Sequence, residues 1–252
     1  MVGLPIDSSK GLRRRKGAKQ LTGGMEEEAR TDAPAGQSSA ASPNLGATLL
    51  RVAWLAIALG IAMEGLLLVL GAGLGKSLGL GSIVADLVGN VSWSVFVCCG
   101  LAVGTAVTKA RVPAMGLLGL LTAPTAFEVS RALHKGTLEA IASTGGGGGE
   151  VLSPVLVGVI KGLEYGCLGL LVGWVGRRAW GGAAAHAAVG FLVGLVFGGT
   201  IIVLTMGSTP PPPPADALSL GVNELLFPIG CSLVLFSAEA LGKRMGNRSD
   251  PG

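Results

Sequence analysis

Ionisable residues inside long apolar segments are the part of this sequence most suited to chemistry. Glu64 lies deep within an apolar run and has no oppositely charged residue at helical spacing. Lys161 and Glu164 stand three residues apart, so on a helix they share one face and can pair. A charged side chain at the centre of a bilayer costs at least ~2.5 kcal/mol unless it is paired or solvated. Such residues are therefore candidates for the passage of an ion, a proton or a small solute.

Other polar residues recur at a comparable depth, near one end of their apolar segments. The candidates for lining an outward-facing polar cavity are Glu64, Asp86, Asn90, Lys161, Glu164, Asn223 and Glu224. Convergence of these side chains on one water-accessible cavity would favour transport, whereas scattered local pairs would favour a structural role. The structural alternative for Glu64 is a neutral acid hydrogen-bonded to a neighbouring helix. For Lys161 and Glu164 it is a simple pair within one helix.

Three further groups of ionisable residues are predicted to have structural roles. The first is an interfacial cluster made of Glu128, Arg131 and His134, whose long side chains reach the membrane surface. The second is His186, which borders a run of small residues and is interpreted as a helix-packing histidine. The third is Glu239 with Lys243, whose i, i+4 spacing predicts a surface pair.

Patterns typical of enzymes and metal sites are missing from the sequence. The run Gly71–Ser77 ends like a phosphate-binding loop, but that motif requires a glycine where Leu70 stands, and no strand precedes it. No GxSxG or HExxH motif occurs within the apolar segments. The four cysteines lack CxxC spacing and are expected to pack as small apolar side chains. We therefore expect no metal site and no cofactor.

The elements that must position these residues are membrane-spanning helices. Half of the residues are apolar, 13% are charged, and the mean hydropathy is +0.63. Apolar runs long enough to cross a bilayer recur six times. The predicted spans are about 49–74, 83–108, 113–133, 154–176, 183–206 and 217–241. The sequence thus predicts an all-α integral membrane protein, a bundle of six transmembrane helices with the lipid bilayer as its partner.

The regions that flank the spans are polar. Residues 1–46 are predicted to be a disordered basic and polar arm, residues 47–244 a six-span membrane domain, and residues 245–252 a short tail. The glycine run at 145–149 is predicted to be a flexible linker. The net charge of +4 lies in the arm and at helix ends, which argues against binding to nucleic acid.

Most of the 19 lysines and arginines fall on one side of such a bundle. They precede the first span or follow the second, fourth and sixth spans. The positive-inside bias therefore predicts that both termini are cytoplasmic. The size and the short loops favour a bacterial plasma (inner) membrane, and an organelle membrane is the alternative.

Two stripes of small residues mark the fourth and fifth spans. The first stripe is Gly158, Gly162, Gly166, Gly169 and Gly173. The second includes Gly190, Gly194 and Gly198. Because small residues let helix backbones approach closely in lipid, we expect these two spans to form a tight hairpin through their stripes. Lys161 and Glu164 lie off the stripe, so they are expected to face another helix or an aqueous cavity.

Together these features favour a small transporter or channel for an ion, a proton or a small solute. A structural or assembly subunit of a larger membrane complex is the alternative. The candidate protein partners are further copies of the chain, in a homo-oligomer, or the other subunits of a larger membrane complex. A membrane enzyme acting on a lipid-like substrate is a third hypothesis, supported by the outer polar residues alone.

Overall fold

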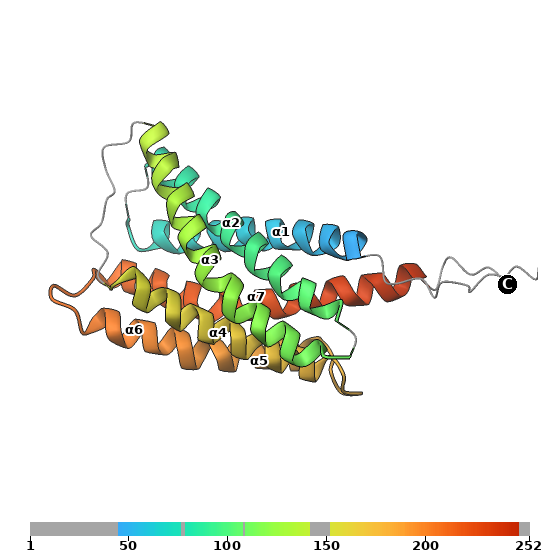
Figure 1. Ribbon diagram of the computed structural model, residues 1–252. Coiled ribbons are helices and arrows are strands. Elements are labelled where there is room, and N and C mark those ends of the chain that lie inside the picture. The colour runs from blue at the N-terminus through green and yellow to red at the C-terminus, as the bar shows by residue number, and fades with distance from the viewer. Residues whose placement is uncertain (1–44, 77–78, 108, 142–151, 247–252) are drawn as a thin grey trace, which may run out of the picture. The chain divides into compact units, whose positions relative to one another are not determined.

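The computed structural model describes residues 45–76, 79–107, 109–141 and 152–246 (Figure 1). All of these belong to the second of the two units into which the chain divides, Ala41–Gly252. Nearly all of the predicted N-terminal arm, the 145–149 linker and the end of the predicted tail lie outside the described residues.

The described residues form helices and contain no strand. The helices are α1 (Leu45–Gly73), α2 (Leu80–Thr105), α3 (Arg111–Ala140), α4 (Pro154–Val175), α5 (Ala183–Val193), the π-helical turn η1 (Gly194–Gly198), α6 (Gly199–Met206) and α7 (Pro214–Gly246). Since α5, η1 and α6 run on as one helix, six helices are long and apolar enough to cross a membrane. The prediction of an all-α chain with six such helices is confirmed.

The helix ends follow local sequence signals rather than hydropathy. Pro154 occupies the first turn of α4, where its missing N–H costs nothing. Gly75, with φ of 73°, ends the turn after α1 in a conformation that favours glycine. The third helix extends to Ala140, beyond the predicted end at 133. Its last residues are polar but include no proline, so the helix continues after the hydropathy has fallen.

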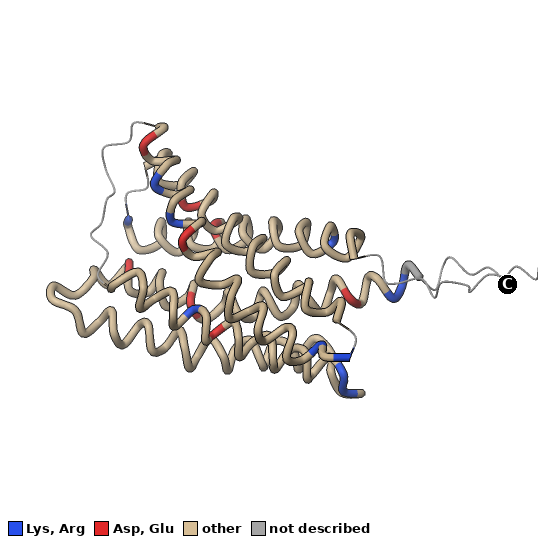
Figure 2. Tube along the Cα trace, in the orientation of Figure 1, with Lys and Arg blue, Asp and Glu red and all other residues tan. Residues whose placement is uncertain are grey.

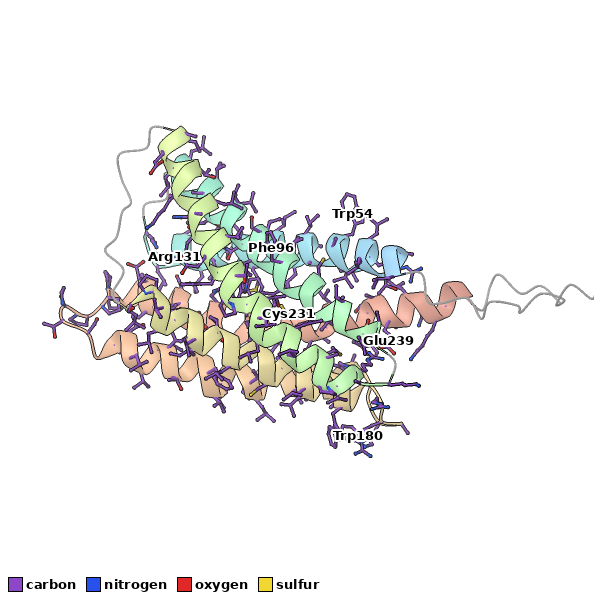
Figure 3. All side chains as sticks on the ribbon, in the orientation of Figure 1. Trp54, Phe96, Arg131, Trp180, Cys231 and Glu239 are labelled. Carbon is purple, nitrogen blue, oxygen red and sulfur yellow. The ribbon has the colours of Figure 1, made fainter. Side chains whose placement is uncertain are left out.

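The helices pack in a definite set of pairs. Helix α3 lies between α2 and α4, α1 packs on α2 and α7, and the α5–α6 helix packs mainly on α7 (Figure 1). The largest fully buried side chains include Tyr165, Phe227, Leu101, Met115 and Leu168. The core therefore lies where α2, α3, α4 and α7 meet, and Trp54 of α1 points outward at 65% exposure (Figure 3).

The stripe on α4 faces α3, so the prediction that it packs against the fifth span is wrong. A Cβ added at Gly169 would collide with the backbone carbonyl of Met115 in α3. At Gly162 it would lie 3.1 Å from the Leu120 oxygen, and at Gly173 it would lie 3.2 Å from Val112 Cα. Gly166 approaches α3 more loosely, 3.4 Å from the oxygen of Gly116, while Gly158 has a ring carbon of Phe127 at 3.9 Å.

The second stripe faces α7 instead of α4. A Cβ at Gly190 would lie 2.5 Å from Ile229 Cα, and one at Gly194 would lie 2.9 Å from the Leu225 oxygen. At Gly198 the nearest atom is Cβ of Glu224, at 2.8 Å. A run of small residues shows which face of a helix can approach another backbone, but it does not identify the partner.

Basic residues gather at one end of the bundle, and the opposite end carries charges of both signs (Figure 2). We call the end where α1 begins and α7 ends the terminal end, and the opposite end the pocket end. Basic residues at the terminal end are Arg51, Lys109, Arg111, Arg177, Arg178, Lys243 and Arg244. The pocket end carries Lys76, Arg131 and Lys135 together with several acidic residues.

Candidate functional site

A buried ion-paired trio joins α4 to α7. The ammonium of Lys161 donates to Oε2 of Glu164 at 2.9 Å and also to Oε2 of Glu224. The side chains of Lys161, Glu164 and Glu224 are 8%, 0% and 7% exposed. The i, i+3 spacing on α4 makes the first contact, but the second comes from a helix far along the sequence. The predicted pair is thus part of a contact between helices.

Aromatic rings surround the ammonium of this trio. Its nitrogen lies 5.9 Å from the centre of the Trp93 ring and 6.0 Å from that of Tyr165. These two rings meet edge to face, with centroids 5.4 Å apart. Cations are attracted to the faces of aromatic rings, and the attraction grows when water is excluded. Trp93 and Tyr165 were not predicted, because no spacing rule links them to Lys161.

The trio borders a cavity of about 470 Å³ at the pocket end of the bundle. The residues that line it come from α2, α3, α4, α6 and α7, and include Lys161 and Glu224. Of the other predicted cavity residues, Asp86, Asn90 and Asn223 also line it. Glu164 does not line the cavity, but its Oε2 accepts a hydrogen bond from Lys161, which does.

Glu64 lies behind the cavity wall. Its side chain is buried, and the amide of Asn90 donates to its Oε2 at 2.8 Å. The carboxyl group of Glu64 is therefore connected to the cavity by one side chain. This contact joins α1 to α2. Glu64 is therefore hydrogen-bonded to a neighbouring helix, and the residue that it contacts lines the polar cavity.

The predicted interfacial cluster divides between the cavity and the surface. Arg131 pairs with Glu128 at 2.9 Å and lies over the Phe127 ring, while the Glu128 side chain is 59% exposed. His134 lies 3.0 Å from the carboxylate of Asp86 on α2. Arg131 and His134 line the cavity together with Asp86, so its lining includes basic and acidic side chains.

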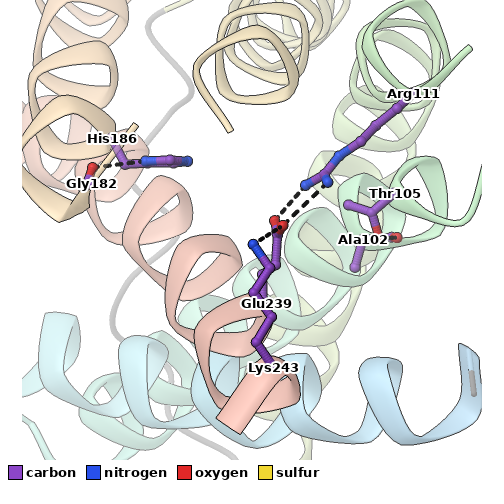
Figure 4. Close-up of polar contacts among 7 residues, drawn as sticks. All are labelled: Ala102, Thr105, Arg111, Gly182, His186, Glu239 and Lys243. Atoms are coloured by element: carbon purple, nitrogen blue, oxygen red, sulfur yellow. Dashed lines mark hydrogen bonds and ion pairs between the residues drawn. The ribbon is translucent and has the colours of Figure 1, made fainter. Parts of the chain in front are cut away.

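A second ionic cluster lies at the terminal end, opposite the cavity (Figure 4). Arg111, in the first turn of α3, contacts both oxygens of Glu239 on α7, at 2.6 and 3.4 Å. Lys243 reaches the same carboxylate at 3.1 Å, as its i, i+4 spacing predicted. The contribution of Arg111 was missed, because sequence alone does not place the start of α3 beside the end of α7.

Apolar side chains fill the bundle between the trio and this terminal cluster. Leu101, Met115 and Leu168 are fully buried there. The sulfur atoms of Cys98 and Cys231 lie 3.4 Å apart in the same core, and both cysteines are free. Figure 3 labels Cys231. A solute in the cavity would therefore meet a packed wall before it reached the terminal end.

The remaining predicted residue, His186, holds helices together. Its Nδ1 lies 3.0 Å from the Gly182 carbonyl (Figure 4). Its ring also packs against Phe236. The hydroxyl of Ser232 on α7 donates to the His186 carbonyl at 2.8 Å. Within the described ranges, no cluster of three or more His, Cys, Asp or Glu side chains has the geometry of a metal site.

Comparison of the chain with protein-family models, with curated proteins and with solved structures found no match.

Proposed function

We propose that this protein is a small membrane carrier that moves an ion or a small solute through the cavity, with the Lys161–Glu164–Glu224 trio as its binding site. The observation that carries the proposal is a buried group of three ionisable side chains, two of which line a cavity of about 470 Å³. Ionisable residues within spans are costly, and they typically mark a pathway for substrate, ions or protons.

The trio joins α4 to α7, whereas the close glycine contacts of the described residues join α3 to α4 and α5 to α7. A bundle held by such contacts gains little from a lysine and two glutamates that must all leave water. A binding role explains their presence, because the site of a secondary transporter lies within the membrane and is lined by polar groups.

The arrangement of cavity, core and terminal cluster supports an outward-facing state. By the positive-inside bias, the basic terminal end is cytoplasmic and the cavity opens toward the opposite side. Apolar packing and the Arg111–Glu239 contact close the cytoplasmic side. Alternating access would require these contacts to separate while the cavity closes. We place the protein in a bacterial plasma membrane, with both termini inside.

The proposal is tested with purified protein in liposomes. Proton, sodium and potassium gradients are imposed in turn, and flux is followed with pH-sensitive and ion-sensitive dyes. Wild-type protein is expected to conduct at least one of these ions, and Glu224→Gln is expected to reduce that flux at least tenfold. Asp216→Asn is the matched control, since it also replaces an acid by its amide but at a side chain that is 45% exposed and away from the cavity.

Folded wild-type protein that moves none of the tested ions would count against the carrier and favour an assembly subunit of a larger complex. Equal ion flux through wild type and Glu224→Gln would show that the trio takes no part in ion transport.

A further inference from the structure

The two carboxylates of the trio outnumber its single ammonium. If all three groups were ionised, the trio would carry a net charge of −1. In the described part of the chain, the ion pairs formed by Glu164 and Glu224 are both with Lys161. A net charge that is buried and uncompensated costs many kcal/mol, so a buried group takes up or releases a proton instead.

The geometry leaves a buried carboxylate oxygen available for that proton. Lys161 occupies Oε2 of both glutamates, while Oε1 of Glu164 is buried and forms no hydrogen bond among the described residues. The Tyr165 hydroxyl next to it in sequence is also buried without a partner.

The other titratable groups near this site are few. Tyr165 shares α4 with Lys161 and Glu164, Glu224 and Cys231 come from α7, and Cys98 comes from α2. Of the groups in contact with the trio, only Lys161 is a base that carries positive charge. The basic residues of α3 that line the cavity, which are Arg131, His134 and Lys135, form no ion pair with Glu164 or Glu224 in the described part of the chain, and the first two contact Glu128 and Asp86. Neutrality of the site therefore depends on one added cation.

We propose that the trio binds one exchangeable proton, received at Oε1 of Glu164, and that this proton is the ion exchanged with the cavity. The inference rests on the proposed function and identifies the transported ion as a proton. Glu224 lines the cavity and can take a proton from water. Lys161 then gives its N–H proton to Oε2 of Glu164, along the existing hydrogen bond, and takes the proton of Glu224 in return. A half-turn of the Glu164 carboxyl group brings the protonated oxygen to the Oε1 position, so the ammonium is unchanged and one proton has moved inward.

Charge balance predicts how many protonated acids each variant holds. Wild-type protein has one in the trio. Glu164→Gln and Glu224→Gln each leave one carboxylate beside one ammonium, so both should have none. Lys161→Met leaves two carboxylates without a cation, so it should have two.

Infrared spectroscopy of the purified protein counts these acids directly, through the carbonyl stretch of protonated carboxylic acids. All variants are made in a Glu64→Gln background, which removes the other buried acid and keeps a group that can bond to Asn90. The expected band disappears in both glutamine variants, doubles in area in Lys161→Met, and shifts when the protein is moved into D₂O. Asp216→Asn should leave the band unchanged.

Several results would overturn the proton site. These are a wild-type spectrum without the band, a band that persists in either glutamine variant, or a band that does not shift in D₂O. The two glutamine variants are close in shape to wild type, so the test does not depend on the folding of Lys161→Met. If the band behaves as expected and no proton flux is found in liposomes, the proton site stands and the carrier function fails. If flux is found without the band, the carrier stands and the proton site fails.

Discussion

Lys161 shows how a costly residue is accommodated inside a membrane-spanning helix. Its ammonium donates to two carboxylates and lies about equally far from two aromatic rings. Removing one partner of such a buried ionic contact typically costs about 3–5 kcal/mol, because the other charge is left without compensation. The same residue thus constrains the contact of α4 with α7 and, in the function proposed above, belongs to the binding site.

Among the described residues, Glu64 accepts a hydrogen bond from one neutral donor, and this bond can be tested by itself. Asn90→Leu removes the amide that donates to Glu64 and should lower the free energy of unfolding by about 1–3 kcal/mol. The double variant Glu64→Leu/Asn90→Leu should recover most of that loss, because no polar group is then left buried without a partner. Thermal or denaturant unfolding in detergent micelles measures both.

Thr125→Ala is the control for this pair. Its hydroxyl donates to its own helix at Leu121 in an exposed position, so its removal should change stability by less than about 0.5 kcal/mol. A single variant Asn90→Leu as stable as wild type would show that Glu64 does not rely on this bond.

Helix α3 is the element on which the arrangement of the bundle depends. It contributes close contacts to α2 on one side and to α4 on the other. On the α4 side its own glycines take part, since a Cβ at Gly119 would overlap the backbone oxygen of Tyr165. That contact fixes the helix turn that carries Lys161, Glu164 and Tyr165.

Two substitutions in α3 test this helix pairing. Gly119→Ala should push α3 and α4 apart and reduce the free energy of unfolding by about 1–3 kcal/mol. Gly136→Ala, in the same helix, has nothing within 4 Å of the added Cβ and should be neutral or stabilising by up to about 1 kcal/mol. Equal stability of the two variants in a denaturant titration would contradict the observed α3–α4 packing.

At the scale of the whole molecule, the two ends of the bundle are built differently. One end has a polar cavity, and the other is held by the contact of Arg111 with Glu239. This contact joins the start of α3 to the end of α7, and the side chains are only 20% and 31% exposed. It is therefore less screened by water than a typical surface ion pair.

Loss of the terminal contact should make the core more accessible from that end. Cys98 and Cys231 are buried and serve as native reporters when Cys99 and Cys167 are replaced by serine. Glu239→Gln should increase their rate of reaction with a charged maleimide added on the side of the termini by about tenfold or more. Lys243→Gln should have little effect, because the Lys243 side chain is 74% exposed and contributes little to a partly buried contact.

A Glu239→Gln protein whose cysteines stay as protected as in wild type would show that the apolar core alone closes this end. A faster reaction from the cavity side only would place the opening at the wrong end.

The sequence by itself determined the class of the protein and the depth of its polar residues. Six apolar runs predicted six helices, because a bilayer requires each crossing segment to satisfy its own backbone hydrogen bonds. The spacing of Lys161 and Glu164 predicted their contact, since helical geometry fixes which residues share a face.

Only the tertiary structure decided which helices meet. The glycine stripe of α4 faces α3 and that of α5 faces α7, although the chain joins α4 to α5 by a short turn. Glu224 reaches Lys161, and Arg111 reaches Glu239, across distances in sequence that no periodicity encodes. Which helices pack together in lipid depends on the fit between two helix surfaces. A sequence pattern within one helix describes only one of those two surfaces.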